Sequence, residues 1–108
     1  MSQHQQVSAL LIEIRSEMQN IGLWQQQPPA PEALASTQPF CVDTLDFNEW
    51  VQWLLLPRLE MMIQQQLPLP QNSEIAPMAE EVFKQMREDT RHLIALIGQL
   101  DMQLRVHH

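Results

Sequence analysis

The stretch DFNEWVQWLLLPRLEMMIQQQ, residues 46–66, predicts a long central helix and determines the fold class. Asp46 and Glu49 have the spacing of a capping box, in which each side chain accepts a hydrogen bond from a backbone N–H group at the helix start. Leu45 and Trp50 are placed as the hydrophobic staple around this start. We therefore expect a helix that is capped by Asp46 and runs to the end of this stretch.

Pro57 interrupts the predicted helix. Its nitrogen carries no hydrogen for the carbonyl of Trp53, and its ring crowds the preceding turn. Sharp bends in helices are commonly found at proline. We expect a kink or a one-residue break at Pro57. Farther along, residues 67–70 (LPLP) predict an extended, polyproline-like connection that ends the element.

Arg58 has an unusual position in this helix. At 100° per residue it falls in the centre of the apolar face that contains Phe47. A buried guanidinium needs a partner, since an unpaired buried charge is costly. We expect that partner to be Asp43 or Asp101, with the free Trp53 carbonyl nearby. Two interpretations stay open: a structural ion pair that fastens the preceding loop, and a binding residue for an anion or carboxylate. The apolar residues of this face are Phe47, Trp50, Val51, Leu54 and Met61.

A second apolar face lies on the other side of the same helix. It is formed by Trp53, Leu56, Leu59 and Ile63. Apolar stripes of this kind are more often core than interface. The long loop that precedes the helix could cover the face. If it does not, Trp53 and Leu56 form an exposed patch of the kind that marks a partner site.

Helical spacing of apolar residues also predicts the other long elements. One helix is expected over 5–21, ended by Gly22. A further helix begins with Pro77 as its first residue. The pattern then lapses at 87–89, where we expect a break, and a last helix follows over 90–105.

The segment between the first two helices is irregular. It contains Pro28-Pro29 and extends to Asp43, with at most one short turn over 31–35. We expect Gln25–Gln27 to be solvated linker. Loops this long are uncommon in small domains and are usually functional or disordered. Phe40 and Val42 indicate that the second half of the loop is held against the core.

These elements together predict an all-α fold: a compact bundle of four main helices, the second kinked at Pro57, with a long ordered loop between the first two. A chain of 108 residues corresponds to one domain, residues 1–108. Short connections between the helices favour a monomer, and a weak homodimer is the alternative.

Composition narrows the classes of function. The chain has 6 Lys and Arg against 13 Asp and Glu, a net charge of −7 and no basic run, which argues against direct contact with nucleic acid. No apolar run is long enough for a membrane span, and no signal peptide is predicted. One cysteine excludes an intrachain disulfide and is typical of a reducing compartment, so we expect a cytoplasmic protein.

Few residues offer catalytic chemistry. Two glycines exclude a Gly-rich phosphate loop, and nothing in the sequence brings Cys41 and His92 together as a nucleophile and base. Glu88, Asp89 and His92 could share a metal on one helix face, but such pairs are common on solvated faces. We expect no catalytic residue, no metal and no cofactor, and therefore no enzyme.

Several short motifs are spread along the chain: Ser36-Thr37-Gln38-Pro39-Phe40, Asp43-Thr44, Glu49-Trp50, Gln52-Trp53, Pro57-Arg58, Pro68-Leu69-Pro70 and Ala76-Pro77. Together they resemble the YqcC-like proteins, a family of small uncharacterised proteins of gamma-proteobacteria. The resemblance extends from about Trp24 into the last helix. It implies an all-helical fold and a cytoplasmic setting, and it brings no activity, cofactor or catalytic residue. Members are often encoded beside a tRNA pseudouridine synthase, which implies an accessory role in RNA modification through a protein partner.

Two functional hypotheses follow. The first is a non-enzymatic protein-interaction module that binds where the 37–44 segment meets the central helix. The second is a domain that binds a small molecule or anion, centred on Arg58 and Asp43. An enzyme is the least favoured class, because no acid–base pair or nucleophile motif is visible. The candidate binding residues are Phe40, Asp43, Trp50, Trp53 and Arg58.

Overall fold

The computed structural model describes residues 2–71 and 73–105, and every regular element within these ranges is helical. The expected all-α fold is therefore confirmed. None of these helices is both long and apolar enough to cross a bilayer. In chain order the elements are α1 (Gln3–Asn20), α2 (Pro31–Leu34), the 3-10 turn η1 (Pro39–Cys41), α3 (Phe47–Trp50), the π-helical turn η2 (Val51–Leu55), α4 (Leu56–Gln64), α5 (Ala76–Phe83) and α6 (Arg91–Arg105).

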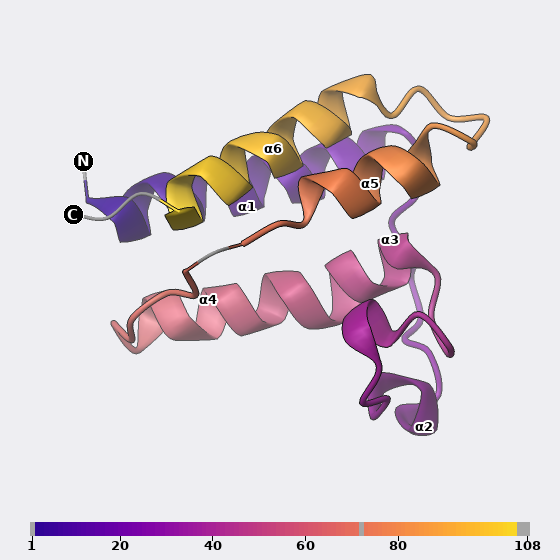
Figure 1. The fold of residues 1–108 in the computed structure, drawn as a ribbon, viewed down its shortest axis with the longest axis horizontal. Coiled ribbons are helices and arrows are strands. Elements are labelled where there is room, and N and C mark those ends of the chain that lie inside the picture. The colour runs from indigo at the N-terminus through magenta and orange to yellow at the C-terminus, as the bar shows by residue number, and fades with distance from the viewer. Residues whose placement is uncertain (1, 72, 106–108) are drawn as a thin grey trace.

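The longer helices pack around one apolar core (Figure 1). α1 contacts both α6 and α4, and α5 contacts α6. In Figure 1, α3, η2 and α4 run as one continuous rod below α1, α5 and α6. The largest fully buried side chains come from α1, η2, α4, α5 and α6. They are Val7, Ile14, Met18, Val51, Leu56, Leu59, Phe83, Leu93, Leu96, Ile97, Leu100 and Leu104.

α1 begins two residues earlier than the periodicity predicts. The reason is a capping box at its start: Ser2 Oγ accepts a hydrogen bond from Gln5 N, and Ser2 N donates to Gln5 Oε1. The end is as expected. Gly22 has φ of 81°, and Leu23 N donates to Met18 O at 2.9 Å, which is the pattern of a Schellman motif.

The central rod also begins as predicted. Asp46 N donates to Glu49 Oε1 at 2.8 Å, and the Asp46 side chain accepts from the backbone of Glu49, so the capping box is present. At the place of the expected kink or break, the rod stays continuous and contains the π turn η2, where Leu56 N donates to Val51 O. A π turn directly before Pro57 gives the proline ring room and accommodates its missing N–H.

The π turn changes which face of the rod is buried. It has the effect of one inserted residue, which rotates the following residues by about 100°. Leu59 therefore occupies the buried direction, at 1% exposure, and Arg58 is exposed. The expectation that Arg58 lies buried in the apolar face is wrong for this reason. Met61, expected on the inner face, is 46% exposed, while Leu56 and Leu59 of the expected second face form the core.

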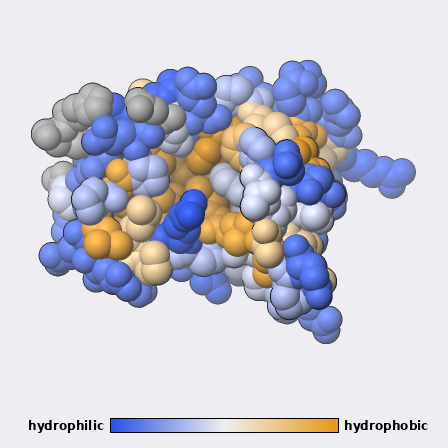
Figure 2. All heavy atoms as spheres, turned by 60° about the horizontal axis from the view of Figure 1, so that its bottom comes forward, coloured by the Kyte–Doolittle hydropathy of each residue, from blue (hydrophilic) through white to orange (hydrophobic). Residues whose placement is uncertain are grey.

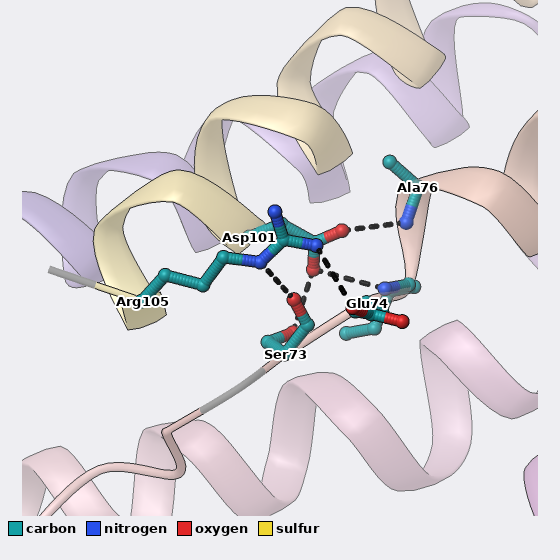
Figure 3. Close-up of polar contacts among 6 residues, drawn as sticks. Ser73, Glu74, Ala76, Asp101 and Arg105 are labelled. Carbon is teal, nitrogen blue, oxygen red and sulfur yellow. Dashed lines mark hydrogen bonds and ion pairs between the residues drawn. The ribbon is translucent and has the colours of Figure 1, made fainter.

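Asp101 has a different role from the one expected of it. Instead of pairing with Arg58, this buried carboxylate accepts hydrogen bonds from Ile75 N at 3.0 Å and Ala76 N at 2.7 Å (Figure 3). These N–H groups lie at the start of α5, which has no side-chain cap of its own. Ser73 Oγ donates to the same carboxylate at 2.6 Å. α6 thus caps α5 across the bundle, where a negative charge also suits the helix dipole.

Arg105 strengthens this contact one turn farther along α6. Its Nε donates to Ser73 O at 2.8 Å, and its guanidinium lies 3.7 Å from Glu74 Oε1. α5 itself is shorter than expected. It ends at Phe83, whose carbonyl accepts from the buried Thr90 Oγ1 at 3.1 Å, and the predicted break lies between them.

Asp101→Asn will destabilise the fold. All three donors lose a charged acceptor, and the new NH2 group faces the N–H of either Ile75 or Ala76, so we expect a loss of roughly 1–3 kcal/mol in the free energy of unfolding. Urea denaturation measures this. Glu60→Gln makes the same kind of change on an exposed side chain of α4 and serves as the control, with a much smaller effect. Equal losses in the two variants would show that Asp101 is no cap.

Candidate functional site

A cleft opens between the central rod and the segment over 34–41, with a volume of about 660 Å³. We call it the aromatic cleft. Figure 2 looks onto the side of the molecule that carries α4 and shows apolar residues gathered in the middle of this face, with hydrophilic residues around the edge. The lining residues are Leu34, Ser36, Gln38, Phe40, Cys41, Trp50, Trp53, Leu54, Leu55, Pro57, Arg58 and Met61.

Aromatic rings in edge-on and tilted contact hold one wall of the cleft in place. Phe40 meets Trp50 edge-on, with ring centroids 4.9 Å apart, and lies 5.8 Å from Phe47. Phe47 in turn makes an edge-on contact with Phe83 at 5.3 Å, which ties the wall to α5 in the core. Aromatic pairs in these geometries add about 0.5–1.5 kcal/mol each beyond the area that they bury.

The backbone of this wall is strained. Phe40 and Cys41 have φ of 57° and 51°, a left-handed conformation that costs non-glycine residues roughly 1–2 kcal/mol each. Local hydrogen bonds fix the turn: Ser36 Oγ donates to Asp43 Oδ1 at 2.6 Å, and Thr44 Oγ1 donates to Ala33 O at 2.7 Å. Together with the ring contacts, these bonds compensate for the strain and keep Phe40 against the rod.

A glutamine network lies outside the lining of the cleft, at a neighbouring hollow that shares Trp53 with it. Gln52, which is buried, donates through Nε2 to Gln25 O and accepts through Oε1 from Gln25 N, both at 2.8 Å. The Gln25 side chain accepts from Trp53 Nε1 at 2.9 Å and donates to Glu49 Oε2 at 3.1 Å. The prediction that Gln25 is solvated linker is therefore wrong. The sequence did contain a signal for this contact. Gln52 is a polar residue within the apolar stretch of the rod, and a buried amide needs hydrogen-bond partners.

The structure brings most of the candidate binding residues together. Phe40, Trp50, Trp53 and Arg58 all line the aromatic cleft. Asp43 lies outside the lining and bonds to Ser36, so the expected Arg58–Asp43 pair is not formed. Within 2–71 and 73–105, Arg58 has no carboxylate at ion-pair distance. Whether these residues bind a partner stays a prediction.

The other reactive residues lie apart from one another. Cys41 is buried beside the aromatic cleft, with its Sγ 3.9 Å from Ser36 O, whereas His92 borders a separate hollow next to Glu17 and Asn20. Asp89 pairs with Arg91 at 2.9 Å, and the hydrogen bonds from Arg91 lower the pKa of this carboxyl to about 2. In the part of the chain that the structure describes, no three His, Cys, Asp or Glu side chains are grouped to hold a metal ion.

A smaller groove lies between α1 and α6, with a volume of about 290 Å³. Leu10 and Met102 contribute its apolar surface, and Glu13 lies at its edge. Met102 is 65% exposed there. This groove contains no aromatic side chain and no cation among its lining residues, so it differs in chemistry from the aromatic cleft.

Comparison with known proteins gives consistent matches over most of the chain. A family model described as DUF446, tRNA pseudouridine synthase C, matches residues 6–103. An uncharacterised protein of Haemophilus influenzae is 36% identical over 82% of this chain and 83% of its own. The uncharacterised protein YqcC of Escherichia coli K12 is 30% identical over 94% and 93%.

Two further matches concern the fold and a longer protein. The solution NMR structure of YqcC from E. coli superposes with a TM-score of 0.82 at 29% identity, covering 100% of this chain and 97% of that one. A protein of Pectobacterium carotovorum named tRNA pseudouridine synthase C is 39% identical over 67% of this chain, and the match covers 19% of its length.

Gln52→Ala will loosen the cleft. The change leaves the Gln25 N–H and C=O without partners, so we expect a loss of roughly 1–3 kcal/mol in the free energy of unfolding. The tryptophan emission of the chain, to which Trp24, Trp50 and Trp53 all contribute, should shift to longer wavelength as the Trp53 side chain becomes more hydrated. Gln64→Ala on the exposed end of α4 is the matched control. Unchanged stability and emission in Gln52→Ala would contradict the anchoring role.

Proposed function

We propose that this chain, which belongs to the DUF446 family, is a non-enzymatic protein-binding module that acts in the cytoplasm with a tRNA pseudouridine synthase. The resemblance to YqcC-like proteins is confirmed by the family match and by the E. coli relative. The relatives that match over most of their own length are uncharacterised. The proposal therefore depends on the matched segment of the longer protein and on the aromatic cleft.

The Pectobacterium match supports the choice of partner. There the related segment is covalently part of a chain named tRNA pseudouridine synthase C, of which it matches 19%. A covalent link between two modules keeps them at an effective concentration on the order of mM. Modules that work together in this way also contact one another through a surface. We infer that the present chain, which matches this segment, carries such a surface.

The aromatic cleft has the composition of that surface. Tryptophan, arginine and methionine are enriched at protein interfaces, and Trp50, Trp53, Arg58 and Met61 all line the cleft. Ring contacts hold Phe40 and Trp50 in place, and a hydrogen bond to Gln25 holds Trp53. A partner therefore loses little free energy in ordering the site.

The charge of the chain supports contact through protein and not through RNA. A net charge of −7 repels a phosphate backbone, and nucleic-acid interfaces are strongly basic. In the proposed complex the synthase makes the RNA contacts. The module then acts on the position or stability of the synthase.

A second candidate function is the binding of a small anion at Arg58. The observation that favours it is the exposed guanidinium, without a carboxylate among the described residues, at a cleft whose volume is within the roughly 300–1,000 Å³ usual for ligand sites. Guanidinium groups bind carboxylates and phosphates in bidentate geometry.

Met61→Glu will weaken binding to the tRNA pseudouridine synthase of the same organism. The change places a carboxylate on the apolar lining, and we expect at least a tenfold rise in Kd by isothermal titration calorimetry. Met102→Glu makes the same substitution at an exposed site on α6 and should leave Kd unchanged. If the two variants bind alike, the cleft is not the interface. If the unaltered chain does not bind the synthase, the proposed function is wrong.

Thermal unfolding in the presence of inorganic phosphate, citrate or succinate tests the second candidate. A ligand that binds the folded state raises Tm by mass action. The anion hypothesis expects such a rise for the unaltered chain and none for Arg58→Met. A flat response to all three anions would remove it.

A further inference from the structure

We infer, building on the proposed function, that the partner segment seated in the aromatic cleft carries a carboxylate next to a bulky apolar side chain. The occupant is thus an acidic and apolar peptide segment of the synthase. Two properties of the lining support this inference. Arg58, its one formally charged side chain, has no ion-pair partner among the described residues, and the surface beside Arg58 is apolar.

Arg58 differs from most cations of this chain. Lys84 pairs with Glu81, Arg91 with Asp89 and Arg105 with Glu74. Arg15 lies over the ring of Trp24, with its guanidinium carbon 5.2 Å from the centroid. Arg87 is exposed and has no ion pair among the described residues, but it is not part of the cleft lining.

Arg58, by contrast, is exposed at the cleft without an ion-pair partner in the described ranges, and no carboxylate is among the lining residues. In a chain of net charge −7 this leaves a local positive site in an acidic surrounding. Such a site selects an isolated negative group over a strongly acidic surface, because the surrounding carboxylates repel the latter.

The rest of the lining selects an apolar neighbour for that negative group. Trp50, Trp53 and Leu54 are half-buried and Met61 is exposed, so their surfaces are open to a ligand. The indole N–H of Trp53 already donates to Gln25 Oε1, which leaves its ring available for apolar contact. A purely ionic ligand would leave this surface in water, whereas an apolar side chain next to the carboxylate would cover it.

A phosphate group of tRNA is the competing occupant of Arg58. It would meet the same guanidinium, but a polyanion brings further phosphates toward the acidic remainder of the surface and gains nothing from the apolar walls. The charge balance therefore favours the peptide. The experiment below includes an arm that separates the two.

The lysine content of the chain makes a direct test simple. Lys84 is its one lysine, so Arg58→Lys introduces a second side-chain amine at a known place in the cleft. A carbodiimide joins an amine to a carboxylate only when the two are in contact. The complex of this variant with the full-length synthase is treated with carbodiimide, and the joined peptides are identified by mass spectrometry. Arg87→Lys, also exposed, is the matched control.

We expect the introduced amine at position 58 to join an Asp, Glu or C-terminal carboxylate of the synthase that is adjacent to an aromatic or large aliphatic residue. The amine at position 87 should give no such product. Arg58→Glu should raise Kd for the synthase at least tenfold, and Arg87→Glu should not. Added tRNA should leave the cross-link yield from position 58 unchanged.

The inference is overturned if the synthase binds but position 58 couples no better than position 87, or couples only within its own chain. It is also overturned if tRNA alone binds the unaltered chain and Arg58→Glu abolishes that binding. In both cases the proposed association with the synthase can still hold. Absence of binding between the unaltered chain and the synthase is a distinct result, and it removes the proposed function as well.

Discussion

The packing of this molecule depends on which side chains of the central rod face the core after Pro57. Pro57 cannot donate to the preceding turn, and the π turn η2 accommodates it with the effect of one extra residue. Leu56 and Leu59 then point into the core, whereas Arg58 and Met61 face solvent. An uninterrupted α-helix would bury the guanidinium and expose Leu59. The positions of the apolar residues after Pro57 therefore fit a buried face only when the π turn precedes them.

Polar groups from distant parts of the chain complete the fold. Asp101 on α6 caps α5, and Gln52 on η2 pairs with the backbone of Gln25. In both cases a segment without a repeating backbone pattern lies against the bundle, and its N–H and C=O groups need partners away from water. Side chains supply those partners. These bonds therefore determine where the connections lie, and through Gln25 they hold Trp53, one of the residues that line the aromatic cleft.

The aromatic cleft has one wall that is held firmly in place and, beside it, side chains that are exposed to solvent. Its wall at Phe40 is held in a strained backbone by ring contacts that reach Phe83 in the core. Strain of this kind persists only where the surroundings over-determine it, and it is concentrated at functional sites. Beside this wall lies an exposed cation in an acidic chain. The relatives from H. influenzae and E. coli, which match over most of their own length, are named uncharacterised, so the cleft is the feature through which the function of this chain can be tested.

The sequence alone determined the features that depend on neighbouring residues. Helical spacing predicted the all-α fold and the positions of the long helices, the Asp46–Glu49 spacing predicted the capping box, and Gly22 predicted the end of α1. Phe40, Trp50 and Trp53 were also singled out correctly as neighbours of one surface. Each of these depends on residues within about one turn or on an apolar pattern, and both are visible in the order of the amino acids.

Only the tertiary structure decided the exposure of Arg58 and the tasks of Asp101 and Gln25. A wheel at 100° per residue assumes an unbroken α-helix, so one π turn is enough to move Arg58 from the centre of the core to the rim of a cleft. The bonds of Asp101 to Ala76 and of Gln52 to Gln25 join residues 25 and 27 positions apart. Contacts over such distances arise from packing of the whole bundle, and no local pattern specifies them.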